Sequence, residues 1–417
     1  MATAKELKAL ARYGGPKSHN KSWRSGPFHV GAELKALEKL LHGPALPMAR
    51  GPAVMALRRQ LQDLYGMKYA VPVSSGSAAI HVALDAVGVG AGDEVIVSPL
   101  TDYGSVIGVF QLNAIPVFAD VDPDTMMMTP ETIAARITAR TRAVMPVHNG
   151  GYPMDMPGVM RLARRHKIPV VEDCAQAHLA SIKGRYLGTF GQISAWSTNE
   201  SKHLKSGEGG FVLTNKKAMA VRADLFADKC YPRFAGAPPS PAFPALNVRL
   251  NEINATLASV QLKRLPGWIK RRQAFADRFY QGVEGVPGIR PQPVPPGGMP
   301  SYWWTAFVVE EEALGVDAVE FCALLSDEGI PAGAKLQQYV PGWEVFRTLD
   351  RDPGAFASYR PGRLKKGAYP LDLAPGARRA QKRVGAVRMS QHNTLGEAAA
   401  AARAVTKIAR ALAGRPD

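Results

Sequence analysis

The sequence predicts an α/β protein with a mostly parallel sheet in a large domain and a smaller α/β domain at the C-terminal end. Short apolar, strand-like runs alternate with segments of helical spacing between residues 70 and 172. This alternation is typical of a parallel sheet that helices cover on both faces. Stretches rich in Pro and Gly at 231–247 and 287–300 interrupt the pattern. Strand and helix signals resume after them, so we expect a second, smaller unit.

The first part of the chain predicts an arm followed by two helices. Residues 1 to about 30 are rich in Gly, Pro, Ser and basic residues and are expected to form an arm or loop. Helical spacing predicts a helix over 30–41, which ends at His42-Gly43-Pro44, and a second helix over 54–65. The predicted organisation is an N-terminal arm with the first helix, the large domain and the small domain, at 1–45, 46–265 and 266–417.

The alternating region predicts the remaining elements in chain order. Apolar runs predict strands at 70–73, 94–97, 116–119, 143–147, 168–172, 193–196 and 211–214. Helical spacing predicts helices at 77–87, 104–112, 130–137 and 156–165. A long helical stretch over 252–280, which Pro266-Gly267 can break, leads to a strand at 305–309, a helix at 318–327 and a final helix at 395–412.

Composition narrows the classes of protein that the chain can represent. Hydrophobic content is 46% and charged content 21% over 417 residues, which is ordinary for a globular protein. No apolar run is long enough to cross a bilayer, and the N-terminus lacks the apolar core of a signal peptide. The three cysteines are far apart, without metal-ligand spacing. We therefore expect a cytoplasmic protein with no disulfide framework, no metal and no membrane contact.

The formal net charge of +17 allows a nucleic-acid partner, an anionic small substrate, or merely a preference of the host for arginine. The basic residues are dispersed, and no aromatic–basic interleaving or zinc-finger spacing accompanies them. A nucleic-acid module is therefore not expected. A positive cleft would instead steer an anionic small molecule.

One lysine lies in a setting that suits covalent chemistry. Lys202 follows the strand-like run 193–196 and precedes the glycine cluster 207–210, which leads into another strand. A lysine that is fixed and partly desolvated in such a turn can lose its proton near neutral pH and attack an aldehyde such as pyridoxal phosphate. The alternative is an ordinary surface lysine in a glycine-rich hairpin.

Two other strand ends carry chemistry that fits such a lysine. Ser74-Ser75-Gly76-Ser77 opens a helix after a strand. It suits a phosphate, although taken alone a plain N-cap at Ser75 or Ser77 is the more common explanation. Asp173 leaves a buried strand, where a carboxylate needs a cation such as a protonated pyridine nitrogen. A loop cap or a salt bridge is the alternative. Gln176 can donate to a ring hydroxyl.

Together these segments resemble the fold type I pyridoxal-phosphate enzymes and, more narrowly, the DegT/DnrJ/EryC1/StrS aminotransferases. The resemblance runs from about Gly14 to the C-terminus. Its marks lie at 92–97, 120–123, 146–148, 172–178, 197–202, 207–210 and 247–252. The resemblance implies that the predicted large domain binds pyridoxal 5'-phosphate (PLP) as a covalent aldimine on Lys202. A lysine at this position favours amino transfer, because family members with a histidine there run dehydrations.

The resemblance also implies individual roles. Lys202 and Asp173 would be the catalytic residues, with Asp173 on the pyridine nitrogen and Gln176 beside the ring hydroxyl. The phosphate would be held by Gly76, Ser77 and Ser197. Asn247 would reach the phosphate from the facing subunit, which implies a homodimer with shared active sites.

Several positions depart from the family pattern. Asp102 stands where an aromatic residue usually covers the cofactor ring, and Tyr103 is its neighbour, so both are candidate cofactor contacts. Lys229 lies in a loop that usually reads Arg-Asn-His-Gly, and 335–339 replaces a histidine-containing substrate loop. Tyr302-Trp303-Trp304 suits either the core of the small domain or a pocket wall. His148 suits either a contact with the cofactor ring or an ordinary hydrogen-bonded position at the end of a strand.

The function implied is transfer of an amino group from an amino acid, glutamine or glutamate, to a carbonyl acceptor in secondary metabolism. The acceptor would be a keto-sugar, a keto-cyclitol or another carbonyl compound, including an anionic one. Two alternatives stay open. One is a PLP-dependent lyase or dehydratase on the same fold, and the other is a non-catalytic regulatory member.

Overall fold

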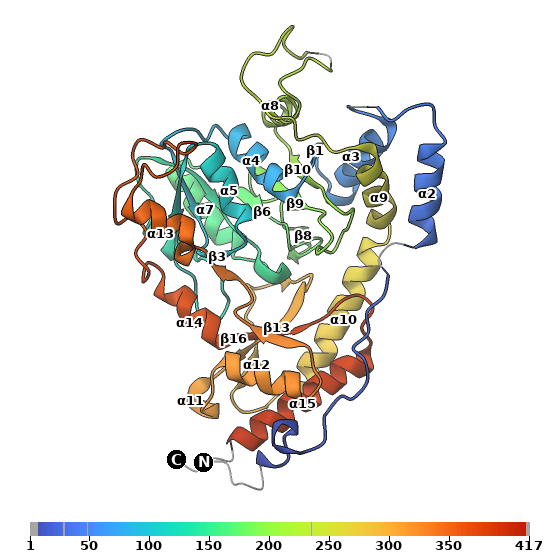
Figure 1. Cartoon of the computed structure of the whole chain (residues 1–417), viewed down its shortest axis with the longest axis vertical. Coiled ribbons are helices and arrows are strands. Elements are labelled where there is room, and N and C mark those ends of the chain that lie inside the picture. Colours follow the sequence, from blue (N-terminus) through green and yellow to red (C-terminus); the bar gives the residue numbers. More distant parts are fainter. Residues whose placement is uncertain (1–6, 28–29, 48, 235, 414–417) are drawn as a thin grey trace.

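The computed structural model describes residues 7–27, 30–47, 49–234 and 236–413. It forms a large upper part around one sheet and a smaller lower part around another (Figure 1). The large sheet has the strand order β1-β10-β9-β6-β5-β2-β4. Its strands are β1 (Tyr69–Val73), β2 (Glu94–Val97), β4 (Ile115–Phe118), β5 (Thr141–Met145), β6 (Val171–Asp173), β9 (Ile193–Ser197) and β10 (Gly210–Thr214).

The large sheet is mostly parallel, as the sequence predicts. The pairs β6–β9, β2–β4 and β2–β5 are parallel, and parallel bridges from Val144 to Val170 and from Val147 to Asp173 join β5 to β6. Strand β10 runs antiparallel to both β1 and β9. The carboxyl ends of the parallel strands therefore meet at one edge, where ligands bind in open α/β sheets.

Helices cover the large sheet on both faces, and apolar residues explain their burial. The covering helices are α3 (Pro52–Tyr65), α4 (Gly76–Ala86), α5 (Gly104–Gln111), α6 (Pro130–Ala134), α7 (Met156–His166) and α8 (Lys217–Ala227). Strands β2, β9 and β10 are buried along their whole length, as expected for strands covered on two sides. Trp196 of β9 stacks on Phe211 of β10 with ring centroids 5.4 Å apart.

The small domain contains an antiparallel sheet of order β11-β13-β16-β14. Its strands are β11 (Ile289–Pro291), β13 (Trp304–Val309), β14 (Ala332–Ala334) and β16 (Val384–Arg388). The helices beside it are α10 (Leu265–Val283), α11 (Glu311–Leu314), α12 (Ala318–Asp327), α14 (Pro375–Arg383) and α15 (Leu395–Ala413), and α10 lies along α15 (Figure 1).

The stretch 252–280 is two helices, α9 (Glu252–Leu262) and α10, because Pro266 lacks an N–H and stands in the first turn of α10. The break that the sequence allows at Pro266-Gly267 is therefore present, just before the proline. Another prediction for this half of the chain needs correction. The predicted linker 287–300 contributes β11 and the short strand β12 (Gly298–Met299). The other predicted interruption, 231–247, has no helix or strand among its described residues and projects beyond α8 (Figure 1).

Further short elements complete the structure. They are α2 (Gly31–Leu41), β3 (Leu100–Thr101), β7 (Ser181–Ile182), β8 (Arg185–Tyr186), β15 (Gln338–Tyr339) and α13 (Glu344–Arg351). Strand β15 follows the small-domain strand β14 and pairs with β3 of the large domain. The segment from β14 to β15 thus leads from the small domain back to the large domain, where it meets β3.

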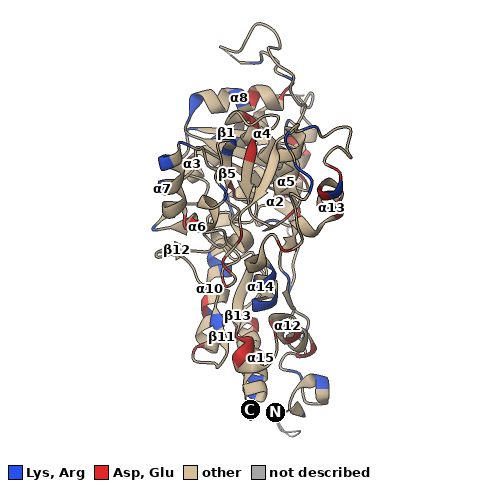
Figure 2. Ribbon diagram, turned by 90° about the vertical axis from the view of Figure 1, so that its left-hand side faces the viewer, with Lys and Arg blue, Asp and Glu red and all other residues tan. Residues whose placement is uncertain are grey.

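The N-terminal arm lies along the small domain. The backbone N–H of Ala11 donates to Glu328 and that of Arg24 to Glu397, and Trp23 contacts Phe275 edge to face. Residues 1–6 and 28–29 of the predicted arm lie outside the described residues. Basic residues occur on both parts of the molecule (Figure 2). Among the described helices, none has the length and apolar character needed to span a membrane.

Candidate active site

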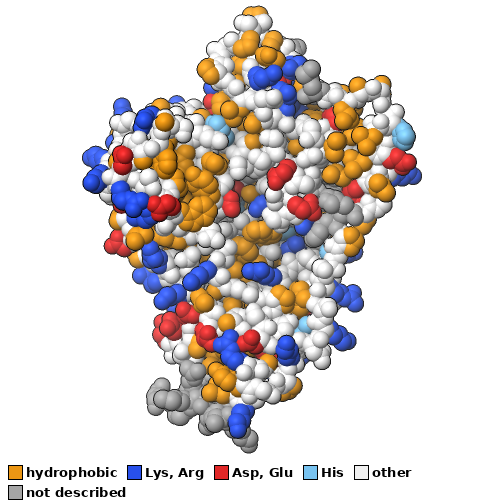
Figure 3. All heavy atoms as spheres, viewed as in Figure 1, with side chains coloured by type: hydrophobic (Ala, Val, Ile, Leu, Met, Phe, Trp, Pro, Cys, Tyr) orange, Lys and Arg blue, Asp and Glu red, His pale blue; other side chains and the backbone are white. Residues whose placement is uncertain are grey.

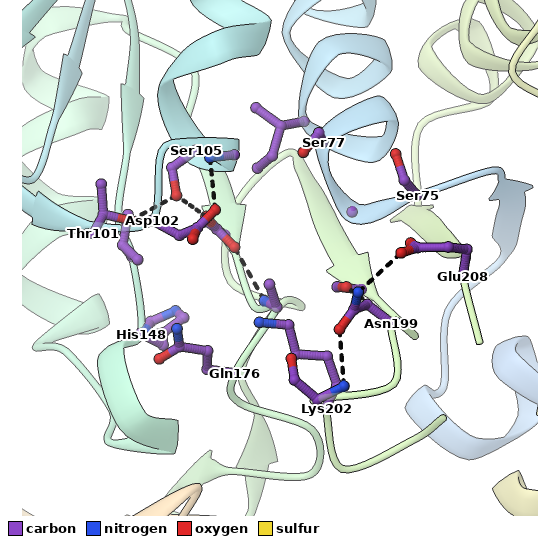
Figure 4. A pocket seen from close by; sticks show the side chains of 18 residues that line it. Ser75, Ser77, Thr101, Asp102, Ser105, His148, Gln176, Asn199, Lys202 and Glu208 are labelled. Atoms are coloured by element: carbon purple, nitrogen blue, oxygen red, sulfur yellow. Dashed lines mark hydrogen bonds between the residues drawn. The ribbon is translucent and has the colours of Figure 1, made fainter. Parts of the chain in front are cut away.

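A cavity of about 390 Å³ lies at the carboxyl edge of the large sheet (Figure 4). This volume is in the range of small-molecule sites. Loops that follow β1, β3, β5, β6 and β9 supply most of its walls. Of the residues singled out from the sequence, the cavity is lined by Gly76, Ser77, Asp102, His148, Asp173, Gln176, Ser197 and Lys202.

The first turn of α4 forms one end of the cavity. Ser75 caps the helix by accepting a hydrogen bond from Ala78 N at 3.1 Å. The first backbone N–H groups of a helix have no carbonyl acceptor within the helix, so they can bind a ligand. A Cβ at Gly76 would lie 2.7 Å from Ser197 Cβ, so this approach of β9 to the helix requires glycine. A small anionic group such as phosphate fits this turn, because the N–H groups and the helix dipole both favour negative charge.

Asp173 forms the buried floor of the cavity. Its Oδ2 accepts a hydrogen bond from Ser105 Oγ at 2.7 Å, and its Oδ1 accepts one from Ala175 N at 3.0 Å. Burial raises the pKa of Asp173, although both hydrogen bonds and nearby Lys202 oppose this shift. A cationic N–H beside the carboxylate would stabilise its charged form.

Sequence reasoning missed Ser105, which supports Asp173. Ser105 lies in the first turn of α5. Because its own proton goes to Asp173, its Oγ accepts a hydrogen bond from Thr101 Oγ1 at 2.6 Å. Thr101, Ser105 and Asp173 therefore form a buried chain from β3 to β6. The signal available in the sequence was a serine just after a strand end, next to the candidate Asp102.

Lys202 lies in the loop between β9 and β10. Its backbone N–H donates to Asn199 O at 2.9 Å, and Asn199 is held by its own bond from Nδ2 to Glu208 at 3.0 Å. Burial lowers the pKa of Lys202, and the carboxylates of Asp173, Asp102 and Glu208 partly counter this shift. A lowered pKa increases the fraction of neutral, nucleophilic amine.

The aromatic triplet at 302–304 divides between core and cavity. Tyr302 and Trp304 are buried in the core. Trp303 is partly buried, and Lys202 Nζ lies 4.6 Å from the centroid of its ring. Trp303 Nε1 also donates to Ser201 O at 2.8 Å. The indole therefore contacts the lysine loop from the small domain.

His148 and its neighbours form a hydrogen-bonded cluster beneath the cavity. Nδ1 of His148 accepts from Met154 N at 3.3 Å, and Nε2 faces Glu172 Oε2 at 3.4 Å. Glu172 and Cys174 have ligand atoms close enough to His148 to suggest a metal. Glu172, however, accepts three backbone N–H groups, and burial raises the pKa of the Cys174 thiol well above its usual value. These groups suit a structural cluster better than a metal site.

Three other candidates from the sequence differ in how they relate to the cavity. Asp102 lines the cavity and also accepts from Gly104 N at 2.7 Å. The ring of Tyr103 packs against Trp343, with centroids 5.3 Å apart, and Tyr103 does not line the cavity. Asn247 lies in a separate surface hollow with Leu46 and Pro47, so within one chain it is not part of the cavity.

A model of the DegT/DnrJ/EryC1/StrS aminotransferase family matches residues 29–355. The chain belongs to this family. It is an aminotransferase, and the enzymes of the family depend on PLP. The residues of the cavity fit that cofactor, because they offer an anion-binding helix turn, a buried carboxylate and a partly buried lysine in one site.

The relatives of this chain include two proteins that are named L-glutamine:2-deoxy-scyllo-inosose aminotransferase. The protein from Micromonospora echinospora is 35% identical over 80% of this chain and 82% of its own length. The protein from Streptomyces fradiae is 42% identical, but the match spans 59% of this chain and 60% of that protein.

Solved aminotransferase structures share the fold. DesV from S. venezuelae, in complex with a ketimine intermediate, matches with a TM-score of 0.78 and 27% identity over 92% of this chain and 95% of that one. An aminotransferase from Psychrobacter cryohalolentis matches with a TM-score of 0.79 and 28% identity over 92% of this chain and 98% of that one. The chain therefore has the fold type I architecture that the resemblance implies.

Proposed function

We propose that this aminotransferase binds PLP in the described cavity, with Lys202 as the residue that forms the covalent link. The observation that carries the proposal is the convergence of three groups on one cavity, namely the amine of Lys202, the carboxylate of Asp173 and the open first turn of α4. When bound, PLP supplies an electron sink for the carbon that gains or loses the amino group.

Each group has a distinct task in this proposal. The backbone of Gly76 and Ser77, with Ser197, holds the phosphate at the start of α4. Asp173 keeps the pyridine nitrogen protonated, since its carboxylate is buried and already oriented by Ser105. Gln176 donates to the ring hydroxyl. Lys202, whose pKa is lowered by burial, accepts and returns the proton at the reacting carbon.

We further propose glutamine or glutamate as the amino donor and a cyclic polyhydroxy ketone as the acceptor in secondary metabolism. The names of the relatives support both choices. The carboxylates of Asp102 and Glu208, which line the cavity, can accept hydrogen bonds from acceptor hydroxyls. An anionic acceptor would have to approach these carboxylates, so we favour an uncharged ketone over the anionic acceptor that the net charge suggests.

The proposed assembly is a homodimer with shared active sites. Helix α2 exposes Leu34 (71%) and Leu41 (62%), and apolar side chains gather over this side of the large domain (Figure 3). Such a face is typical of a protein–protein interface. A second copy seated there would bring its Asn247 toward the phosphate, as the family resemblance implies. The three free cysteines are buried, which supports a cytoplasmic location.

The test is reduction of the PLP-loaded protein with borohydride, followed by peptide mapping and product analysis. We expect the label on Lys202, and we expect nitrogen to move to the ketone while both carbon skeletons are conserved. A label on another lysine would reject the cofactor assignment. Release of a carbon fragment would indicate a lyase instead, and a product that has lost one of the acceptor hydroxyl groups would indicate a dehydratase.

A further inference from the structure

The side-chain amide of Gln176 is held on one side by two donors. The backbone N–H of Gly150 lies 2.8 Å from Gln176 Oε1, and Gln337 Nε2 lies 2.8 Å from the same oxygen. All three groups are buried. The carbonyl oxygen of the Gln176 amide is thus fully engaged on the side away from the cavity.

These contacts determine which way the Gln176 amide faces. A backbone N–H can only donate, so the atom that meets Gly150 N must be the carbonyl oxygen and not the amide nitrogen. The second contact then requires Gln337 to present its own Nε2 as the donor. Gln176, which lines the cavity (Figure 4), is left with its NH2 group for a ligand.

Gln337 belongs to the small-domain segment that returns to the large domain. Its backbone carbonyl accepts from Gln381 Nε2 at 3.0 Å, which ties it to α14. The next residue, Gln338, pairs with Thr101 in the β15–β3 ladder. Thr101 is the start of the buried chain through Ser105 to Asp173. One segment, 337–339, therefore supports both candidate contacts to the polar atoms of the cofactor ring.

We propose that Gln337 is a positioning residue of the aminotransferase reaction. Together with Gly150 N, it holds the Gln176 amide so that the NH2 group faces the ring hydroxyl of the cofactor, and it does so without touching the cofactor. The inference depends on the proposed placement of PLP in this cavity. A donor at the ring oxygen stabilises its negative form, so the proton shared between this oxygen and the Lys202 nitrogen is released at lower pH.

The test is a pH titration of the visible absorbance of the PLP-loaded protein. In Gln337→Met one of the two donors to Gln176 Oε1 is lost, and only Gly150 N still holds the amide in its orientation. We expect the midpoint to rise by about half to one pH unit, the equivalent of one hydrogen bond. Gln337→Glu, whose carboxylate only accepts, places a negative oxygen beside Gln176 Oε1 and opposes the orientation that Gly150 N favours, so it should raise the midpoint at least as much.

A double-mutant cycle tests whether Gln337 changes the midpoint through Gln176. Gln176→Met should raise the midpoint, because it removes the donor to the ring hydroxyl. Gln176→Met/Gln337→Met should add little to it, because Gln337 acts only through that donor. Gln338→Met is the matched control, because it changes an exposed side chain and keeps the backbone pairing with Thr101; it should titrate as the unaltered protein does.

Three results would contradict the proposal. Folded Gln337→Met and Gln337→Glu proteins with an unchanged midpoint would show that Gln337 does not orient Gln176. Fully additive shifts in the double mutant would show that the two residues act separately. If the unaltered protein developed no visible band with PLP, the proposed function itself would be wrong and this inference would fall with it.

Discussion

His178 and Ser197 are joined by a buried hydrogen bond, with 2.9 Å between the imidazole Nε2 and the carbonyl oxygen. A carbonyl only accepts, so Nε2 carries the proton and Nδ1 is left to accept from the Tyr65 hydroxyl, 3.3 Å away. Burial lowers the pKa of His178 to about 4, so the ring stays neutral. This bond ties the loop after β6 to the end of β9, beside Gly76.

The His178 bond predicts a specific loss of stability in acid. The unfolded chain takes up a proton near the ordinary pKa of 6.5, whereas the folded chain resists it until about pH 4. The free energy of unfolding should therefore fall as the pH drops through this window, by about 3 kcal/mol from this group. Urea unfolding between pH 7 and pH 4.5 measures the slope.

The matched variants are His178→Gln and His166→Gln. Neither glutamine titrates, but only His178 is buried, while His166 is exposed at the end of α7. We expect His178→Gln to be less stable at pH 7 and to show a flatter acid slope. An equal flattening in His166→Gln would contradict the assignment.

The strand ends were predictable from the sequence because the fold class places them together. Gly76, Asp173 and Lys202 follow three different strands, and a mostly parallel sheet brings such positions to one edge. In the structure, these three residues accordingly line one cavity. A segment that carries no recognisable strand end or motif could not be assigned to the cavity by this reasoning.

Trp303 and Gln337 illustrate what the sequence could not provide. Both come from the small domain, and their contacts with Lys202 and Gln176 depend on how that domain sits against the large one. Residue spacing carries no information on such tertiary contacts. The aromatic triplet at 302–304 therefore allowed both a core and a site interpretation, and the structure divides it between the two.

Ser105→Ala should weaken catalysis through Asp173. Loss of the 2.7 Å bond to the carboxylate removes a hydrogen bond to a charged group, worth about 1.5–3 kcal/mol. If most of this energy orients Asp173 in the transition state, turnover falls by about tenfold to a hundredfold. Steady-state kinetics with glutamine and a cyclic ketone measures the change. Ser201→Ala, a change to another cavity-lining serine, should have a much smaller effect; equal losses in both variants would rule out the specific role of Ser105.

Asp173→Asn should separate cofactor binding from turnover. The asparagine keeps the size of the side chain but removes the charge that we propose stabilises the protonated ring. Loss of one partner of a buried ion pair costs about 3–5 kcal/mol, which corresponds to at least a hundredfold loss in turnover. We expect the phosphate end to retain the cofactor, as measured by absorbance after gel filtration. Full activity in the variant would reject the role of Asp173.

The same substitution should alter the titration of Lys202 in the cofactor-free protein. Burial lowers the pKa of this amine below its ordinary value of 10.5, while the Asp173 carboxylate is the strongest of the charges that raise it again. Removal of that carboxylate leaves burial less opposed, so the pKa falls further and more of the amine is neutral at pH 8. Reductive methylation at a series of pH values, with quantification of the peptide that contains Lys202, reports the midpoint directly.

We expect Asp173→Asn to shift the midpoint of Lys202 to lower pH, and Glu208→Gln to shift it in the same direction by less. Exposed Lys167 provides the internal reference in each digest and should not move. A midpoint that rises in Asp173→Asn would mean that the carboxylate and the amine do not share one electrostatic environment, and the proposed pairing of these two residues around the cofactor would then be untenable.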